Sequence, residues 1–228
     1  MTRILAVETS TEACSCALWC DGELDEDFAL IPRLHTQHLL PMVARLLARA
    51  QLGFADLDAI AVGRGPGSFT GLRIAMGVAQ GLAFAAGLPL LPVSTLATLV
   101  CQVASEGTLS EDSWIFSTMD ARIDQVYWGW YRWDPREPQL YGEENLTRPE
   151  QVTLPPQNSP LIGVGSGLVF RERLPPDLQQ RLITAYPDCL PRSRHVASLA
   201  ASRWLAGDRG VNPELAEPLY LRERVTHS

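Results

Sequence analysis

The sequence predicts an α/β protein built from two halves of similar topology, on three observations. Short apolar runs, such as RILAV (3–7), alternate with helical patterns, as in α/β folds. In each half an apolar run ends at a carboxylate, Glu8 or Asp120, and a turn and a second apolar run follow. In each half a later apolar run leads into a glycine-rich turn and then a helix. The repeated order of elements indicates an ancient duplication.

Composition and charge narrow the class of protein. The chain has 228 residues, 46% hydrophobic and 20% charged, which is typical of a globular protein with room for one large or two small domains. The formal net charge is -7. An acidic chain is a poor binder of nucleic acid by itself, because phosphate contacts need Lys and Arg. The N-terminus is too acidic for a signal peptide, and no uncharged run of 18 residues occurs, so we expect a cytoplasmic protein without membrane association.

The first half predicts a compact series of strands and helices. Strands are expected at 3–7, 14–20, 26–30, 58–62 and 88–94. Helices are expected at 35–52, at 69–86, where Gly87 follows the last turn, and at 95–104. We expect the first domain to span residues 1–104.

The second half, residues 105–228, is expected to form the second domain. Strands are predicted at 113–119 and 126–133, a strand that runs into a glycine-rich turn within 161–170, and an amphipathic helix at 192–207. The strand VYWGWYRW is aromatic on both faces, which favours burial over a surface that stacks bases. Residues 135–160 are rich in Pro, Asn and Gln and predict irregular surface, and EPLYLR (217–222) predicts an extended segment that docks.

Cysteines and histidines do not predict a metal site. Cys14, Cys16 and Cys20 have even spacing, so on a strand they share one face and cannot converge on a tetrahedral ion. His35 and His38 lie three residues apart with no third ligand apparent. We expect the cysteines to be small apolar core residues and these histidines to be exposed polar ones.

The stretch GRGPGSFTGLRIAMGVAQGLA (63–83) has two interpretations. Gly71 is not followed by a Lys-Ser or Lys-Thr pair, so the motif is not a P-loop. Ser68 and Thr70 lie near a helix N-terminus, where free N–H groups can hold an anion. Alternatively, the glycines only permit a tight turn with close backbone approach.

Glu8 and Asp120 also have two interpretations. Each carboxylate follows an apolar strand and could hold magnesium beside a phosphate, as in an ATPase or phosphotransferase, or it could cap its own turn. The turn TSTEAC after Glu8 lacks the glycine that phosphate loops use. The candidate remnant of a nucleotide or phosphate site comprises Glu8, Thr9, Ser10, Ser68, Thr70 and Asp120.

The helix predicted at 69–86 is apolar on most sides. Only Arg73 and Gln80 are polar within its middle turns, whereas a surface helix has a broad polar face. Gly77 and Gly81 are four residues apart and would allow another helix to approach closely. The helix is therefore buried either within its own domain or against another subunit.

The quoted motifs resemble those of the TsaB (YeaZ) family, the bacterial subunits for tRNA threonylcarbamoyladenosine biosynthesis. The glycine-loop string carries the resemblance together with ILAVETSTEACSCAL, PVSTLATLV, MDARIDQVYWGWY and EPLYLR. It extends to about residue 222 and is weakest at 135–188. The resemblance implies an α/β, duplicated actin-like (ASKHA, ribonuclease H-like) fold of two similar domains.

The resemblance also implies a function in tRNA processing. Family members are non-catalytic partners of a paralogue, TsaD, which transfers threonylcarbamoyl to the adenosine beside the anticodon of tRNAs that read ANN codons. A small ATPase, TsaE, joins the complex. The paralogue carries Asn-His-x-x-x-His after the corresponding helix, and Thr95 and Leu99 stand at the two histidine positions here. The resemblance therefore implies a pseudo-enzyme without catalytic residues, metal or tightly bound cofactor, with ATP or ADP as a candidate ligand at the joint between subunits.

The two helices 35–52 and 69–86 are the expected contact surface. They would pack on the equivalent pair of TsaD as a four-helix interface, or on a second copy in a homodimer when the chain is alone. The tRNA would be bound indirectly, through the complex. The expected interface residues are His38, Met42, Arg45, Arg49, Arg73, Met76, Gly77, Gln80, Gly81 and Phe84.

Overall fold

The structure is a computed structural model that describes residues 1–105, 107, 109–156 and 158–221. The chain forms two compact units. Unit 1 comprises Met1–Thr98 and Leu190–Pro218. Unit 2 comprises Leu99–Cys189 and the described residues from Leu219 onwards. Arg222, the last residue of EPLYLR, lies outside the described residues.

Unit 1 is built on a five-stranded mixed sheet in the order β3-β2-β1-β4-β5. β1, β2 and β3 are antiparallel neighbours, whereas β4 and β5 run parallel to β1. The strands are β1 (Arg3–Glu8), β2 (Ala13–Cys20), β3 (Glu23–Leu30), β4 (Ala59–Gly65) and β5 (Leu90–Ser94). The helical elements in the chain order of this half are α1 (His35–Ala50), η1 (Phe54–Asp56), α2 (Phe69–Ala86) and α3 (Thr95–Ser105).

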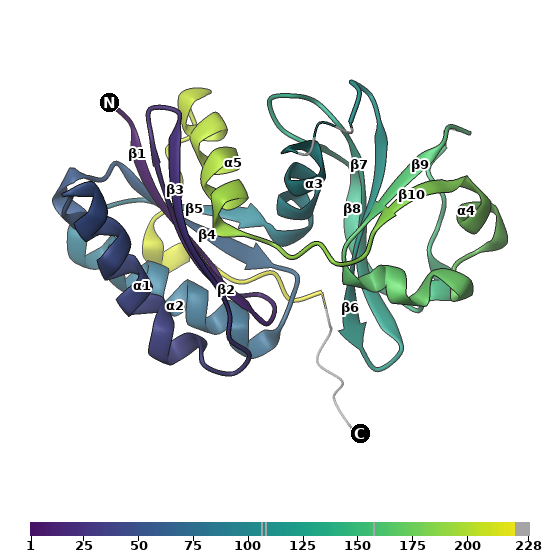
Figure 1. The fold of residues 1–228 in the computed structure, drawn as a ribbon, viewed down its shortest axis with the longest axis horizontal. Coiled ribbons are helices and arrows are strands. Elements are labelled where there is room, and N and C mark those ends of the chain that lie inside the picture. Colours follow the sequence, from purple (N-terminus) through teal and green to yellow (C-terminus); the bar gives the residue numbers. More distant parts are fainter. Residues whose placement is uncertain (106, 108, 157, 222–228) are drawn as a thin grey trace. The chain divides into compact units, whose positions relative to one another are not determined.

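Helices cover both faces of this sheet (Figure 1). α1 and α2 pack on one face, and their buried residues join a core that includes Leu5, Val7 and Leu46. Cys14 and Cys16 lie in this same core, as the even spacing predicted. α5 (Ser193–Leu205) packs against β1 and β2 and buries Val196 among other residues. Burial on both faces explains why β1 and β4 are almost entirely apolar.

Unit 2 repeats the topology of unit 1. Its sheet order is β10-β9-β6-β7-β8, with β6, β7 and β8 antiparallel and with β9 and β10 parallel to β6. The predicted duplication and α/β fold class are therefore confirmed. The elements are β6 (Trp114–Arg122), β7 (Gln125–Arg132), β8 (Gln139–Thr147), η2 (Pro149–Gln151), β9 (Leu161–Val164), η3 (Ser166–Arg173), α4 (Pro176–Arg181) and β10 (Leu182–Tyr186).

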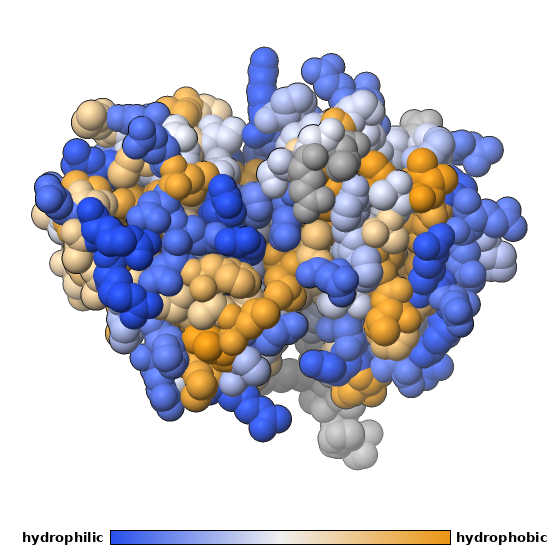
Figure 2. Space-filling model, viewed as in Figure 1, coloured by the Kyte–Doolittle hydropathy of each residue, from blue (hydrophilic) through white to orange (hydrophobic). Residues whose placement is uncertain are grey.

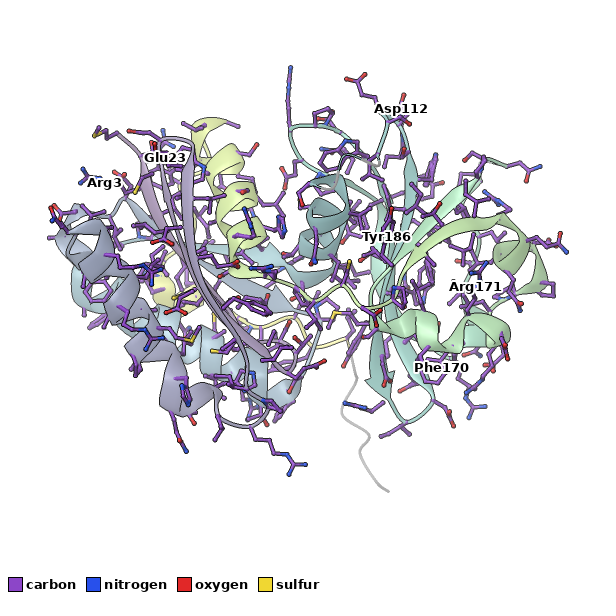
Figure 3. The ribbon with its side chains drawn as sticks, viewed as in Figure 1. Arg3, Glu23, Asp112, Phe170, Arg171 and Tyr186 are labelled. Carbon is purple, nitrogen blue, oxygen red and sulfur yellow. The ribbon has the colours of Figure 1, made fainter. Side chains whose placement is uncertain are left out.

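Aromatic side chains dominate the core of unit 2. Phe116 packs beside Trp130 with ring centroids 5.0 Å apart, and Trp128 lies against both rings. The predicted burial of the aromatic strand is therefore confirmed. The η3 segment is fixed to the sheet by Arg171, whose guanidinium donates to the carbonyl of Leu182 at 2.8 Å (Figure 3).

Three features of the second half differ from expectation, and one of them is β10, for which no strand was predicted. β8 lies within residues 135–160, where irregular surface was predicted, because β8 is a mostly exposed edge strand and its polar sequence QLYGEENLT resembles a loop. The two units are also not the contiguous domains 1–104 and 105–228 that the sequence predicts, because unit 1 includes a segment from the end of the chain. α5 belongs to unit 1 because Ser193 N–H donates to the Ser15 hydroxyl and because Glu26 accepts from the Arg194 N–H. The η4 turn (Pro213–Leu215) also belongs to unit 1.

Candidate functional site

The glycine loop of unit 1 packs directly against the turn that follows β1. A Cβ on Gly71 would lie 2.0 Å from the Thr9 carbonyl oxygen, and one on Gly67 would lie 2.8 Å from that of Ser10. Ser68 N–H donates to the Ser10 carbonyl at 2.8 Å, and the Thr9 hydroxyl donates to the Gly71 carbonyl at 2.7 Å. The glycines are therefore needed for close approach of two segments of the same chain.

Glu8 is enclosed by this packing, with a relative exposure of 1%. Its Oε1 accepts from Ser10 N–H at 2.5 Å, and its Oε2 has no hydrogen-bond partner among the described residues. A Cβ on Gly63 would lie 1.9 Å from Oε2, so only glycine leaves room for the carboxyl group. Burial raises the pKa of Glu8, although contacts with Ser10, Thr9 and Thr95 act in the opposite direction. A carboxyl group that is enclosed in this way is not accessible to a hydrated magnesium ion.

The other residues of the predicted nucleotide or phosphate site differ in their exposure and contacts. Thr9 and Ser10 are buried, whereas Ser68 and Thr70 are exposed. Ser68 is the N-cap of α2, and its hydroxyl accepts from Gly71 N–H at 3.3 Å. Five of the six residues, all but Asp120, therefore belong to the loop and turn of unit 1.

Asp120 lies in unit 2 and caps its own turn, which is one of the two predicted interpretations. Its Oδ1 accepts from Arg122 N–H at 2.7 Å, and its own N–H donates to the Ser166 hydroxyl at 3.1 Å. Unit 2 also repeats the close glycine packing, because a Cβ on Gly167 would lie 2.1 Å from the Thr118 hydroxyl oxygen.

The described residues contain no group of three or more His, Cys, Asp or Glu side chains that could hold a metal ion. The Nε2 atom of His35 lies 3.2 Å from the Ala13 carbonyl oxygen, and the side chain is buried, which corrects the expectation that His35 is exposed. Burial raises the pKa of Cys14 to about 11. Thr95 and Leu99 are both fully buried on α3.

The outer side of α2 is apolar and open. Only 33% of its 18 residues are buried, and α2 is the one helix in the described part of the chain that is long and apolar enough to cross a membrane by length and composition. A Cβ on Gly77 or Gly81 would meet no atom within 4 Å. Phe84 is 70% exposed and Phe69 is 56% exposed. Hydrophobic residues gather in the lower part of unit 1 (Figure 2).

The predicted interface residues on α1 are partly committed to other contacts. Arg45 pairs with Asp27 at 2.8 Å, and Arg49 pairs with Asp25 at 3.0 Å, so both guanidiniums are tied to β3 while remaining half-exposed. His38 is partly buried. These contacts hold the arginines on the side of α1 that faces β3.

Three predicted interface residues are placed differently from expectation. Met42 and Met76 are buried in the core of unit 1, which corrects the expectation that they face outwards. The Gln80 amide donates to the carbonyls of Pro213 and Ala216 at 2.9 and 3.0 Å, so it holds the C-terminal part of unit 1 against α2. Leu40, by contrast, is exposed. Apolar residues at both 40 and 42 make the helical periodicity ambiguous there.

The exposed face continues into a groove of about 550 Å³ at the C-terminal end of α2. Phe84 and Leu88 line it from one side, and Arg209, Val211 and Glu214 line it from the other. No sequence pattern predicts this groove, because it joins segments more than 120 residues apart.

The comparisons with known proteins agree with this architecture. The family model TsaD: tRNA N6-adenosine threonylcarbamoyltransferase matches residues 29–167, which places the chain in that actin-like class of proteins. The chain is 39% identical to the tRNA threonylcarbamoyladenosine biosynthesis protein TsaB of Escherichia coli, over 98% of this chain and 96% of that protein. It is 37% identical to the protein of the same name from Haemophilus influenzae, over 98% and 94%.

A solved structure shows the same relationship. The structure of YeaZ from Pseudomonas aeruginosa matches with a TM-score of 0.90 and 44% identity, over 97% of this chain and all of that one. The chain belongs to the TsaB (YeaZ) family.

Proposed function

We propose that this chain is the non-catalytic subunit that binds and activates the catalytic paralogue TsaD during formation of threonylcarbamoyladenosine beside the anticodon of tRNAs reading ANN codons. The observation that carries the proposal is the open, apolar outer side of α2, where Gly77 and Gly81 leave room for another helix. The relatives from Escherichia coli and Haemophilus influenzae are named as tRNA threonylcarbamoyladenosine biosynthesis proteins, which supports a role in this modification.

Docking would bury the apolar side chains that α1 and α2 now expose. Full burial of a side chain such as Phe84 or Leu40 gains about 1.5–3 kcal/mol. The two glycines would let the partner's helix approach close to the α2 backbone, and α1 would complete a four-helix interface. Without the paralogue, a second copy would take the same place in a homodimer, because a two-fold interface uses the same patch on both subunits.

The proposed role is not catalytic. Thr95 and Leu99 are buried at the positions that resemble the metal-binding histidines of the paralogue, and a leucine side chain has no atom that binds a metal. Glu8 is enclosed beside Gly63 and is only 1% exposed, so its carboxyl group is not open to a ligand. The chain would act in the cytoplasm by ordering TsaD, with TsaE joining the complex and with ATP or ADP at the joint between subunits. The tRNA would be held through the complex, since the chain itself is acidic.

A reconstituted assay tests the proposal. Purified TsaC, TsaD and TsaE would be incubated with unmodified tRNA, threonine, bicarbonate and ATP, and nucleosides would be measured by mass spectrometry. We expect threonylcarbamoyladenosine only when this chain is added, and none from the chain with tRNA and the adenylate alone. Equal modification without the chain would contradict the proposed role, and tight ATP binding by the isolated chain would then favour an ATPase.

Replacement of Gly77 tests the surface itself. Gly77→Glu places a charge in the open space on α2, so we expect binding to TsaD to fall at least about tenfold while the fold is retained or slightly stabilised, since Glu is a better helix former than Gly. Binding would be measured by calorimetry and stability by thermal unfolding.

Gln180→Glu is the matched control, because it adds one charge to an exposed position of α4 in unit 2. It should leave binding unchanged. Undiminished binding by Gly77→Glu would show that the paralogue docks elsewhere.

A further inference from the structure

The hairpin tip between β6 and β7 has an unusual backbone. Arg122 and Gln125 are paired across the hairpin, and Ile123 and Asp124 form a two-residue loop. Arg122, Ile123 and Asp124 have φ values of 64°, 52° and 56°, so three consecutive non-glycine residues adopt the left-handed conformation. The positive φ at both loop residues matches a type I′ turn, in which Asn-Gly is strongly preferred.

Ile123 is the least favourable of these residues. A β-branched side chain at positive φ is a genuine conformational outlier, because its Cβ substituents crowd the backbone. Packing within the chain does not account for it, since Ile123 is 78% exposed and the side chain of Arg122 is 85% exposed. Strained residues of this kind are concentrated at functional sites.

The base of the tip is nevertheless held firmly. The Asp120 carboxylate accepts from Arg122 N–H, and Asp124 pairs with Arg173 at 2.8 Å. Arg173 also pairs with Glu150 at 2.6 Å. The backbone of the tip is therefore held in place while it presents an aliphatic side chain and a guanidinium, which lies 3.4 Å from the Asp120 carboxylate, so little backbone entropy is lost on binding.

We propose that the tip, defined here as Arg122–Asp124, is a second contact site through which unit 2 binds a protein of the modification complex. Ile123 would insert into an apolar pocket of that protein, and Arg122 would pair with a carboxylate at the rim of the pocket. A protein is the favoured partner over tRNA, because the apex is aliphatic and has neither an aromatic surface for stacking nor a cluster of cations. This inference rests on the proposed function, but it concerns a surface in the unit that does not contain α2.

Ile123→Asn separates the contact from the stability of the fold. Asn adopts positive φ more readily than Ile, so we expect the melting temperature of the chain to rise by about 2–4 °C. In the reconstituted assay, we expect the chain concentration that gives half-maximal modification to rise about tenfold, with the maximum rate unchanged. Arg122→Ala should raise the same concentration severalfold.

Ile183→Asn is the matched control, since Ile183 is 68% exposed on β10 of the same unit and has no positive φ. It should neither raise the melting temperature nor change the half-maximal concentration. A chain that is more stable yet binds less well is a result that a purely structural role for Ile123 would not give.

Several outcomes would overturn the inference. An unchanged half-maximal concentration for Ile123→Asn would show that the tip makes no contact, and an unchanged or lower melting temperature would remove the strain argument. An effect of Arg122→Ala without one of Ile123→Asn would indicate an anionic partner such as tRNA. If the wild-type chain itself fails to stimulate modification, the proposed function fails and this inference fails with it.

Discussion

At Gly63 the backbone of β4 runs directly beside the carboxyl group of Glu8. The space that a Cβ would need is filled by Oε2, so the glycine and the buried acid depend on each other. The neighbouring hydroxyls of Ser10 and Thr95 also have buried oxygens with no hydrogen-bond partner among the described residues. A carboxyl group in such a setting favours its neutral form, because desolvation penalises the charge.

The pH dependence of stability should therefore carry a signature of Glu8. Its pKa is higher in the folded protein than in the unfolded chain, so its contribution to stability is fully present below the unfolded pKa. That contribution is lost as the pH rises through the folded pKa. We expect the free energy of unfolding of Glu8→Gln, relative to the wild type, to be larger at pH 8 than at pH 5.

Urea denaturation at the two pH values measures this difference. Comparing variant with wild type cancels the contributions of other groups, such as Asp208, whose pKa is lowered first by a hydrogen bond from Gly210 N–H. A difference that does not change with pH would mean that Glu8 is ionised in the folded state.

For single residues, the sequence predicts which of them lie close together but not the direction in which their side chains point. The order of motifs predicts that Glu8, Thr9 and Ser10 form a turn beside the glycine loop. It cannot predict that the Glu8 carboxyl points into the protein, because that depends on Gly63, which is 55 residues away. Met42 and Leu40 illustrate the same limit, since a local pattern leaves the inner side of α1 ambiguous by about half a turn.

Among the elements, α5 is held to unit 1 by one carboxylate at its N-terminus. Glu26 accepts from the Arg194 N–H at 3.0 Å and from the Ser193 hydroxyl at 3.4 Å, and it pairs with Arg192. The Glu26 side chain is almost wholly buried. Such a group satisfies free N–H donors of the helix and complements its dipole.

Removing this carboxylate should loosen α5. We expect Glu26→Ala to lower the free energy of unfolding by about 2 kcal/mol, the typical loss for a buried charge-assisted hydrogen-bonded pair. Glu23→Ala is the control, because Glu23 is exposed on the same strand, and it should change stability little. Chemical denaturation measures both, and equal stability of the two variants would contradict the role assigned to Glu26.

Elements with strong periodicity are predictable, and polar edge elements are not. The apolar pattern and Gly87 predict α2 at residues 69–86, which the structure confirms. β8 was missed because its first five residues are exposed and it pairs with a neighbour on one side only. β10 was missed for a related reason, since it has only five residues and also lies at an edge of its sheet.

Over the whole molecule, the two units are alike in topology yet unlike in surface. Unit 1 exposes the apolar outer side of α2, whereas its arginines on α1 are paired with β3. Unit 2 exposes a strained hairpin tip above an aromatic core. After duplication, each unit therefore kept the same sheet and close glycine packing while acquiring a different candidate contact surface.

Because α5 belongs to unit 1 but follows most of unit 2 in the sequence, unit 1 is completed only late in synthesis. Residues up to β5 leave the ribosome first, but one face of their sheet is covered only when α5 has been synthesised. The intervening stretch is roughly a hundred residues, which takes about 5–20 s at ordinary rates of translation. During that interval an apolar sheet face is open to chaperones and to premature contacts. The N-terminal half should therefore aggregate when it is expressed by itself, whereas in the full chain α5 covers this face of the sheet.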